Sequence, residues 1–109
     1  MSKIINIYTI FEDHVRVDIQ TSTKFGSMLI DKDKIDEFKK YKWRIIDTDD
    51  GNIYNYYIYT EIRDENNKRR MLYANRITLD LTVDDKVKVH YKNGDKFDNR
   101  KENLIVKYI

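Results

Sequence analysis

Alternating apolar and polar residues predict three strands at the start of the chain. Apolar residues cluster over residues 4–11, and Val15, Val17 and Ile19 are each separated by one polar residue. Strict alternation is typical of a half-buried strand, so these segments predict two strands that turn near residues 12–13. A third strand is expected over residues 26–31. Together these strands account for residues 1–30.

The middle of the chain predicts a short helix followed by an antiparallel meander. Ile35 and Phe38 lie three residues apart and follow candidate N-cap residues at Asp31 and Asp33, which indicates a helix over residues 34–41. The remaining expected elements are strands over residues 42–47 and 53–62, a type I′ turn at residues 50–51 between them, and a strand or strand-then-helix over residues 69–79.

The C-terminal part predicts a strand, a loop and a helix. Apolar residues alternate over residues 87–91, and the Asn-Gly pair at residues 93–94 favours a turn. Asp98 resembles an N-cap that precedes an apolar face, so a helix of about two turns is expected over residues 98–108. That face would be formed by Leu104, Ile105 and Tyr108.

Composition narrows the class of protein. The chain has 109 residues, no cysteine and no proline, and 40% of its residues are hydrophobic. One domain over residues 1–109 is expected, since a chain of this length buries a single core. The absence of cysteine excludes disulfides and Cys-ligated metal sites. No apolar segment approaches the length of a membrane span, so we expect a cytoplasmic protein with no membrane partner.

Charge is distributed unevenly along the chain. The formal net charge is +2, but residues 1–62 carry a net charge of −2 and residues 63–109 carry +4. An anion-binding surface is therefore expected in the second half. The same half contains His90, one of 2 histidines, followed by asparagine and arginine side chains that can orient water, metal or phosphate.

Residues 89–104 read V-H-Y-K-N-G-D-K-F-D-N-R-K-E-N-L. This segment resembles the HNH motif of phage and intron homing endonucleases, approximately D-H-x-N-G-x-x-x-D-N-R-x-x-N-L. Upstream, M-L-I-D-K-D-K-I-D-E-F-K-K-Y-K-W-R-I and M-L-Y-A-N-R-I-T-L occupy the places of two further family elements, so the resemblance covers about residues 27–106. It implies an α+β fold in which an antiparallel sheet or meander is followed by an HNH-like ββα element at about residues 86–108.

The resemblance also implies roles for individual residues. His90 matches the general base, Asn99 matches the asparagine that orients the loop, and Asn103 matches a late metal ligand. The family holds a divalent ion such as Mg²⁺ with an Asp at the position before the base, where this chain has Val89. Because valine offers no donor to a hard cation, we expect no cleavage, with an active Mg²⁺-dependent nicking endonuclease as the alternative.

Two further groups of side chains are candidate binding residues. The basic residues that would contact DNA phosphates in a family member are Arg76, Lys88, Lys92, Lys96, Arg100 and Lys101. The tyrosines of residues 53–62 alternate between both faces of their strand, which exceeds what a sheet with one solvated face requires. The protein-interface candidates are Tyr54, Tyr56, Tyr57 and Tyr59.

These features leave three functions open. The first is a phage-type protein that acts by binding, either as an inhibitor of a host defence nuclease such as a CRISPR effector or as a DNA-binding regulator, and that needs no cofactor. The second is a Mg²⁺-dependent nicking endonuclease that acts on DNA. The third is a DNA-binding accessory module for transcription or recombination.

Overall fold

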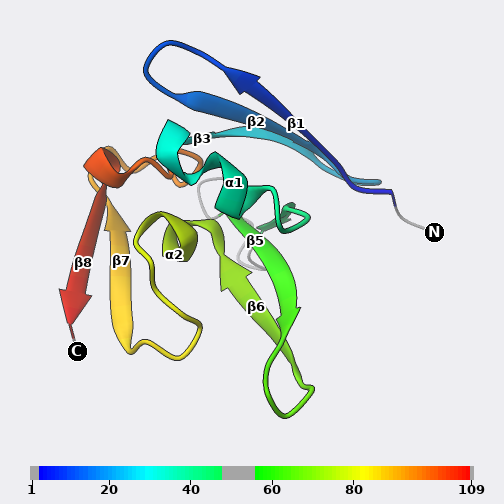
Figure 1. Ribbon diagram of the computed structural model, residues 1–109, viewed down its shortest axis with the longest axis vertical. Coiled ribbons are helices and arrows are strands. Elements are labelled where there is room, and N and C mark those ends of the chain that lie inside the picture. The colour runs from blue at the N-terminus through cyan, green and yellow to red at the C-terminus, as the bar shows by residue number, and fades with distance from the viewer. Residues whose placement is uncertain (1–2, 48–55, 109) are drawn as a thin grey trace.

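The N-terminal sheet lies along one side of the computed structural model, which describes residues 3–47 and 56–108 (Figure 1). Its strands pair antiparallel in the order β1-β2-β3. The alternating residues Val15, Val17 and Ile19 are fully buried on its inner face, which confirms the period-two pattern. The strands are β1 (Ile5–Ile10), β2 (Val15–Gln20) and β3 (Phe25–Ile30).

A second antiparallel sheet, in the order β4-β5-β6, follows a short helical segment. The predicted helix over residues 34–41 is shorter than expected, and the strand-then-helix over residues 69–79 is confirmed. The predicted turn at residues 50–51 lies outside the described residues. No described helix could cross a membrane. The elements are η1 (Lys32–Lys34), α1 (Ile35–Phe38), β4 (Arg44–Asp47), β5 (Tyr56–Arg63), β6 (Arg69–Tyr73) and α2 (Ala74–Thr78).

The C-terminal segment forms a two-stranded antiparallel hairpin of β7 (Val87–Tyr91) and β8 (Leu104–Tyr108), with η2 (Lys101–Asn103) before β8. The prediction of a helix over residues 98–108 is therefore wrong. Residues 104–108 supply the hydrogen-bonding partner that β7 needs, and β-branched residues in this stretch favour a strand. Among the described residues from 86 to 108, no α-helix accompanies the two strands. The structure thus contains antiparallel sheets with a few short helices, an α+β arrangement.

The core lies between the N-terminal sheet, α1 and the β4-β5-β6 sheet. Trp43 and Phe38 are fully buried, and the indole N–H of Trp43 donates to the backbone oxygen of Phe38 at 2.9 Å. Gly26 allows the two sheets to approach each other, because a Cβ at this position would lie 2.9 Å from Cδ1 of Ile45. Thus residues far apart in the sequence form one apolar cluster.

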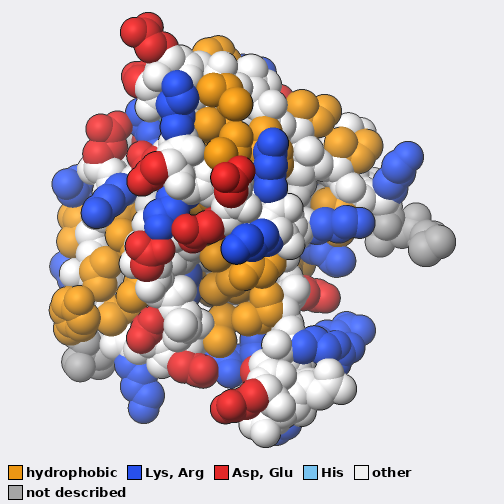
Figure 2. All heavy atoms as spheres, in the orientation of Figure 1, with side chains coloured by type: hydrophobic (Ala, Val, Ile, Leu, Met, Phe, Trp, Pro, Cys, Tyr) orange, Lys and Arg blue, Asp and Glu red, His pale blue; other side chains and the backbone are white. Residues whose placement is uncertain are grey.

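The surface in Figure 2 carries side chains of both charge signs mingled together, with apolar side chains exposed between them. On this face the net charge of +2 produces no large region of one sign. A binding surface must therefore be identified from particular residues and their partners.

Candidate functional site

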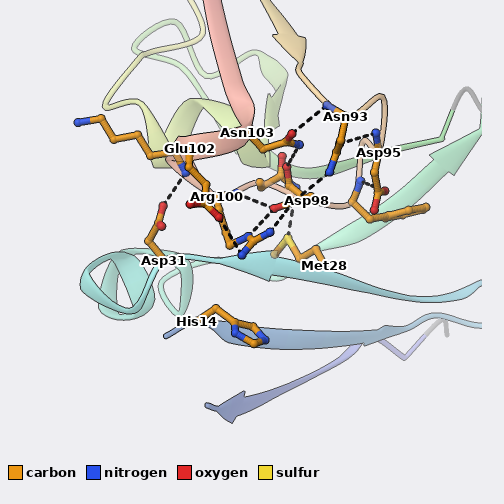
Figure 3. A network of polar contacts seen from close by, with 12 residues as sticks. His14, Met28, Asp31, Asn93, Asp95, Asp98, Arg100, Glu102 and Asn103 are labelled. Atoms are coloured by element: carbon orange, nitrogen blue, oxygen red, sulfur yellow. Dashed lines mark hydrogen bonds and ion pairs between the residues drawn. The ribbon is translucent and has the colours of Figure 1, made fainter. Parts of the chain in front are cut away.

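The loop between β7 and β8, residues 92–103, is held together by a buried carboxylate (Figure 3). Asp98 is only 3% exposed, and its carboxylate accepts hydrogen bonds from Nε and Nη2 of Arg100, both at 2.8 Å. The side-chain amide of Asn93 donates to the same carboxylate at 3.3 Å. Arg100 also pairs with Glu102 at 2.9 Å. We call this group the Asp98–Arg100 clasp.

The clasp keeps Asp98 ionised. Burial by itself would raise the pKa of this carboxyl, but hydrogen bonds from the side chain and backbone of Arg100 outweigh it and lower the pKa below its ordinary value. A buried charge is tolerated when it is paired and hydrogen-bonded, as it is here. Asp98 and Arg100 therefore satisfy one another, and Arg100 is not free to bind a phosphate.

Asn103, the candidate metal ligand, fastens the same loop. Its Oδ1 accepts from the backbone N–H of Asn93 at 3.0 Å, and its Nδ2 donates to the backbone oxygen of Asp98 at 3.0 Å. Both ends of the amide are occupied, and the residue is buried. The Asn93 amide thus takes one of the two lone pairs of Oδ1.

Asn99, the candidate loop-orienting residue, connects the loop to two other parts of the fold. It is fully buried, and its backbone N–H donates to the oxygen of Leu29 in β3 at 2.9 Å. Its Oδ1 accepts from the hydroxyl of Tyr91, which in turn accepts from Nδ2 of Asn75. Burial raises the pKa of Tyr91 to about 12, so the hydroxyl keeps the proton that it donates. This chain of contacts is structural.

His90, the candidate general base, lies on the exposed face of β7 opposite Ile105 of β8. It borders a shallow depression of about 250 Å³, which we call the His90 depression. Four of the residues expected to be functional line this depression, namely Tyr57, Arg76, Lys88 and His90. Its lining residues are Tyr57, Tyr73, Asn75, Arg76, Lys88, Val89 and His90.

The donor set around His90 does not fit a divalent cation. Among residues 3–47 and 56–108, no group of three or more His, Cys, Asp or Glu side chains is placed to hold a metal ion. Val89 contributes only alkyl groups to the depression. Neither Asp95 nor Asp98 lines the depression, and the carboxylate of Asp98 is bound by Arg100.

Arg76 borders the His90 depression, but its guanidinium supports the chain around it. Nη1 donates to the backbone oxygens of Thr82 at 2.7 Å and Asp85 at 3.0 Å, and Nη2 donates to that of Val87 at 3.3 Å. These bonds fix the segment that leads into β7. Arg76 therefore acts first as a structural residue.

The remaining basic candidates differ in their surroundings. Lys96 lies over the ring of Tyr57, 4.2 Å from its centroid, and donates to its hydroxyl at 2.9 Å. By contrast, Lys88, Lys92 and Lys101 are exposed. Lys88 lies directly opposite Lys107 in the β7–β8 register. Lys107 was not among the expected residues, and the predicted helix over residues 98–108 concealed this pairing.

Tyr56 points toward the core side of the β4-β5-β6 sheet. It packs against the core cluster and stacks on Phe97 with ring centroids 6.3 Å apart. This contact gives the partly buried Tyr56 a packing role. Tyr54 lies outside the described residues.

Tyr57 and Tyr59 lie on the opposite face of the sheet, which is partly exposed. Tyr59 pairs in register with Tyr73 of β6, and the rings of Tyr57 and Tyr73 have centroids 5.5 Å apart. Sequence reasoning missed Tyr73, because its place beside Tyr57 and Tyr59 depends on the register of β6 with β5. The strand register therefore extends the expected aromatic surface to a third tyrosine.

Comparison of the chain with protein-family models, curated proteins and solved structures finds no match. The resemblance to HNH nucleases thus stays a prediction from the sequence. Functional conclusions rest on the residues and contacts described above.

Proposed function

We propose that this chain binds nucleic acid without cleaving it, through the outer face of the β7–β8 hairpin and the adjoining His90 depression. The outer face carries Lys88 and His90 on β7 and Lys107 on β8. Phosphate groups of the ligand would contact these side chains, which position a nucleic acid without reading its sequence.

The observation that carries this proposal is the cross-strand lysine pair. Like charges directly opposite each other in a sheet are destabilising. Lys88 and Lys107 occupy such a pair, and neither has an acidic partner among the described residues. A bound phosphate would offset their mutual repulsion. Binding of an anion would therefore stabilise this pair more than it would stabilise two isolated lysines.

The environment of His90 supports binding without cleavage. Hydrolysis by the expected mechanism needs a general base and a cation that stabilises the charge developing on the phosphate. His90 could serve as the base, but Val89 offers no donor, which leaves the expected cation with a single neutral amide oxygen of Asn103 that already accepts a hydrogen bond. In this proposal the β7–β8 hairpin is an HNH-like element whose basic surface persists and whose metal site does not.

A second candidate function is inhibition of a host defence nuclease by a phage-type protein. Its support is the outer face of the N-terminal sheet, opposite Val17 and Ile19, where Ile7 is 56% exposed and Phe25 73%. Exposed large apolar side chains on one face are typical of protein interaction sites. Such a partner would be held mainly by apolar contacts rather than by phosphates.

Binding of a labelled DNA duplex, measured by fluorescence anisotropy at several salt concentrations, tests the proposal. We expect affinity to fall steeply between about 50 and 200 mM salt. The double variant Lys88→Gln/Lys107→Gln should weaken binding about tenfold at low salt and make the salt dependence shallower by about two phosphate contacts. The charge-matched control is Lys39→Gln/Lys68→Gln, whose lysines are exposed elsewhere, and it should retain binding. Equal loss in both double variants would contradict the assignment.

A plasmid-nicking assay with Mg²⁺ or Mn²⁺ tests the absence of cleavage. We expect no nicking by the native chain. Nicking that appears only in Val89→Asp would identify the lost ligand, whereas robust native nicking that His90→Ala abolishes would establish the endonuclease alternative. Salt-insensitive binding to a nuclease, without DNA binding, would favour the inhibitor.

A further inference from the structure

The outer face of the β4-β5-β6 sheet presents a row of side chains across three strands. Arg44 of β4, Tyr59 of β5 and Tyr73 of β6 are neighbours in register, so their side chains lie on the same face. Residues in the adjoining register positions, Ile58 and Leu72, are buried on the opposite face. We call Arg44, Tyr57, Tyr59 and Tyr73 the tyrosine face.

The two tyrosines of the row are partly exposed. Tyr59 has no ring or hydrogen-bond partner among the described residues. Tyr73 is contacted at an angle by Tyr57, with an interplanar angle of 55°. Tyr57 itself is covered by the ammonium group of Lys96. A planar ligand would therefore stack on Tyr59 and Tyr73, with Lys96 beside it.

Basic residues lie at both ends of this face. At one end, Arg44 and Tyr59 border a polar hollow of about 150 Å³, together with the turn at residues 21–23. At the other end, Tyr57 and Tyr73 border the His90 depression and thus adjoin Lys88. The tyrosine face therefore connects Arg44 to the lysine pair proposed above to bind phosphates.

We infer that the ligand is a single-stranded nucleic acid whose unpaired bases stack on Tyr59 and Tyr73. This inference rests on the proposed function and names the form of nucleic acid that the site takes. Single-strand binding surfaces combine aromatic platforms for bases with a basic track for the backbone, as this sheet does. The bases of a duplex are stacked on each other and cannot lie flat on a sheet.

The same face indicates the path that the bound nucleic-acid strand takes across the sheet. Glu61 is exposed in the register position next to the Tyr59–Tyr73 row, opposite Met71. Its carboxylate would repel phosphates, so the backbone runs from Arg44 toward Lys96 and Lys88. Two inter-strand spacings, about 10 Å, separate Arg44 from Tyr73, which leaves room for about two bases.

The first test compares ligands with the wild-type chain. Labelled 15-nucleotide DNA and RNA strands of mixed sequence are measured by anisotropy against the DNA duplex of the same sequence. We expect at least one single strand to bind about tenfold more tightly than the duplex, the gain from stacking one base. Equal or tighter binding of the duplex would overturn the inference and leave the proposed function intact. Binding of none of the three would overturn both.

The second test removes one platform. Tyr59→Leu keeps an apolar side chain but loses the aromatic ring, and it should weaken single-strand binding about tenfold. Tyr59→Phe is the matched control and should bind within about twofold of wild type, because it keeps the ring. Equal binding by both variants would overturn the inference.

A third measurement requires no substitution. A single strand that carries 5-bromouracil is irradiated on the wild-type chain, and crosslinked peptides are identified by mass spectrometry. We expect adducts on Tyr59 or Tyr73. Crosslinks confined to peptides outside the tyrosine face would overturn the inference even if Tyr59→Leu fails to fold.

Discussion

The β7–β8 loop and the tyrosine face are both rich in polar or aromatic side chains, but they use them in opposite ways. In the loop, Asp98, Arg100 and Asn103 hydrogen-bond to one another or to nearby backbone. On the tyrosine face, Arg44 and Tyr59 have no side-chain partner among the described residues. These polar side chains of the loop therefore bind within the loop, whereas those of Arg44 and Tyr59 do not bind another described side chain.

This difference shows why a motif alone is a weak guide to the binding surface. The residues that most resemble the nuclease motif, Asn99 and Asn103, are among the buried polar residues of the chain. Buried polar groups must be hydrogen-bonded, and a long loop has many backbone groups to satisfy. Folding alone therefore accounts for Asn99 and Asn103 at these positions.

Removal of the Asp98–Arg100 clasp should give the largest decrease in the free energy of unfolding. Asp98→Ala leaves Arg100 half-buried without its carboxylate and deprives Asn93 of an acceptor. Loss of one partner of a buried pair costs about 3 kcal/mol, so the free energy of unfolding should fall by about that amount. Urea unfolding followed by fluorescence of the single Trp43 measures it. A change below about 0.5 kcal/mol, the range of ordinary surface substitutions, would show that the loop is not self-supporting.

The clasp should also make stability depend on pH in the acid range. Because the pKa of Asp98 is lowered in the folded chain, its contribution is present above the unfolded value of about 3.9 and is lost as the pH falls through the folded value. Asp98→Asn cannot take up this proton. The difference in unfolding free energy between wild type and variant should therefore shrink as the pH is lowered from about 5 toward 2. If this difference in unfolding free energy did not change with pH, the ion pair would not be a source of stability.

The smallest effect on stability is expected in the His90 depression. His90 is exposed and lies on the outer face of β7, so His90→Gln should change the free energy of unfolding by less than about 0.5 kcal/mol. Its effect should instead appear as weaker nucleic-acid binding, because His90 borders the proposed binding surface beside Lys88. Strong destabilisation by His90→Gln would show that the His90 depression, like the β7–β8 loop, supports the fold.

Much of the fold could be predicted from local patterns. The alternation of Val15, Val17 and Ile19 predicted a strand because each of these side chains needs the same buried face. Trp43 is the one tryptophan of the chain, and its large apolar ring system favours the full burial that the structure shows. Residues 69–79 carried both a strand and a helix signal, and both elements form in that order.

The candidate site was predictable only in part. His90, Lys88 and Tyr57 were identified from the sequence, and the structure brings them to one depression. Their neighbour Tyr73 was missed because it reaches this place through the register of β6 with β5, which no local pattern reports. Arg76 donates hydrogen bonds to backbone oxygens, and the residue types in the sequence do not reveal such acceptors.

The sequence by itself determined the apolar alternation of the strands and the positive charge of the second half. Only the tertiary structure decided that residues 104–108 form a strand, that Asn99 and Asn103 turn inward, and that Arg44 and Tyr73 share a face with Tyr59. The physical reason is that side-chain periodicity is local, whereas hydrogen-bond partners and burial are supplied by residues distant in the sequence. β7 selected β8 as its partner, and that pairing placed Lys88 opposite Lys107.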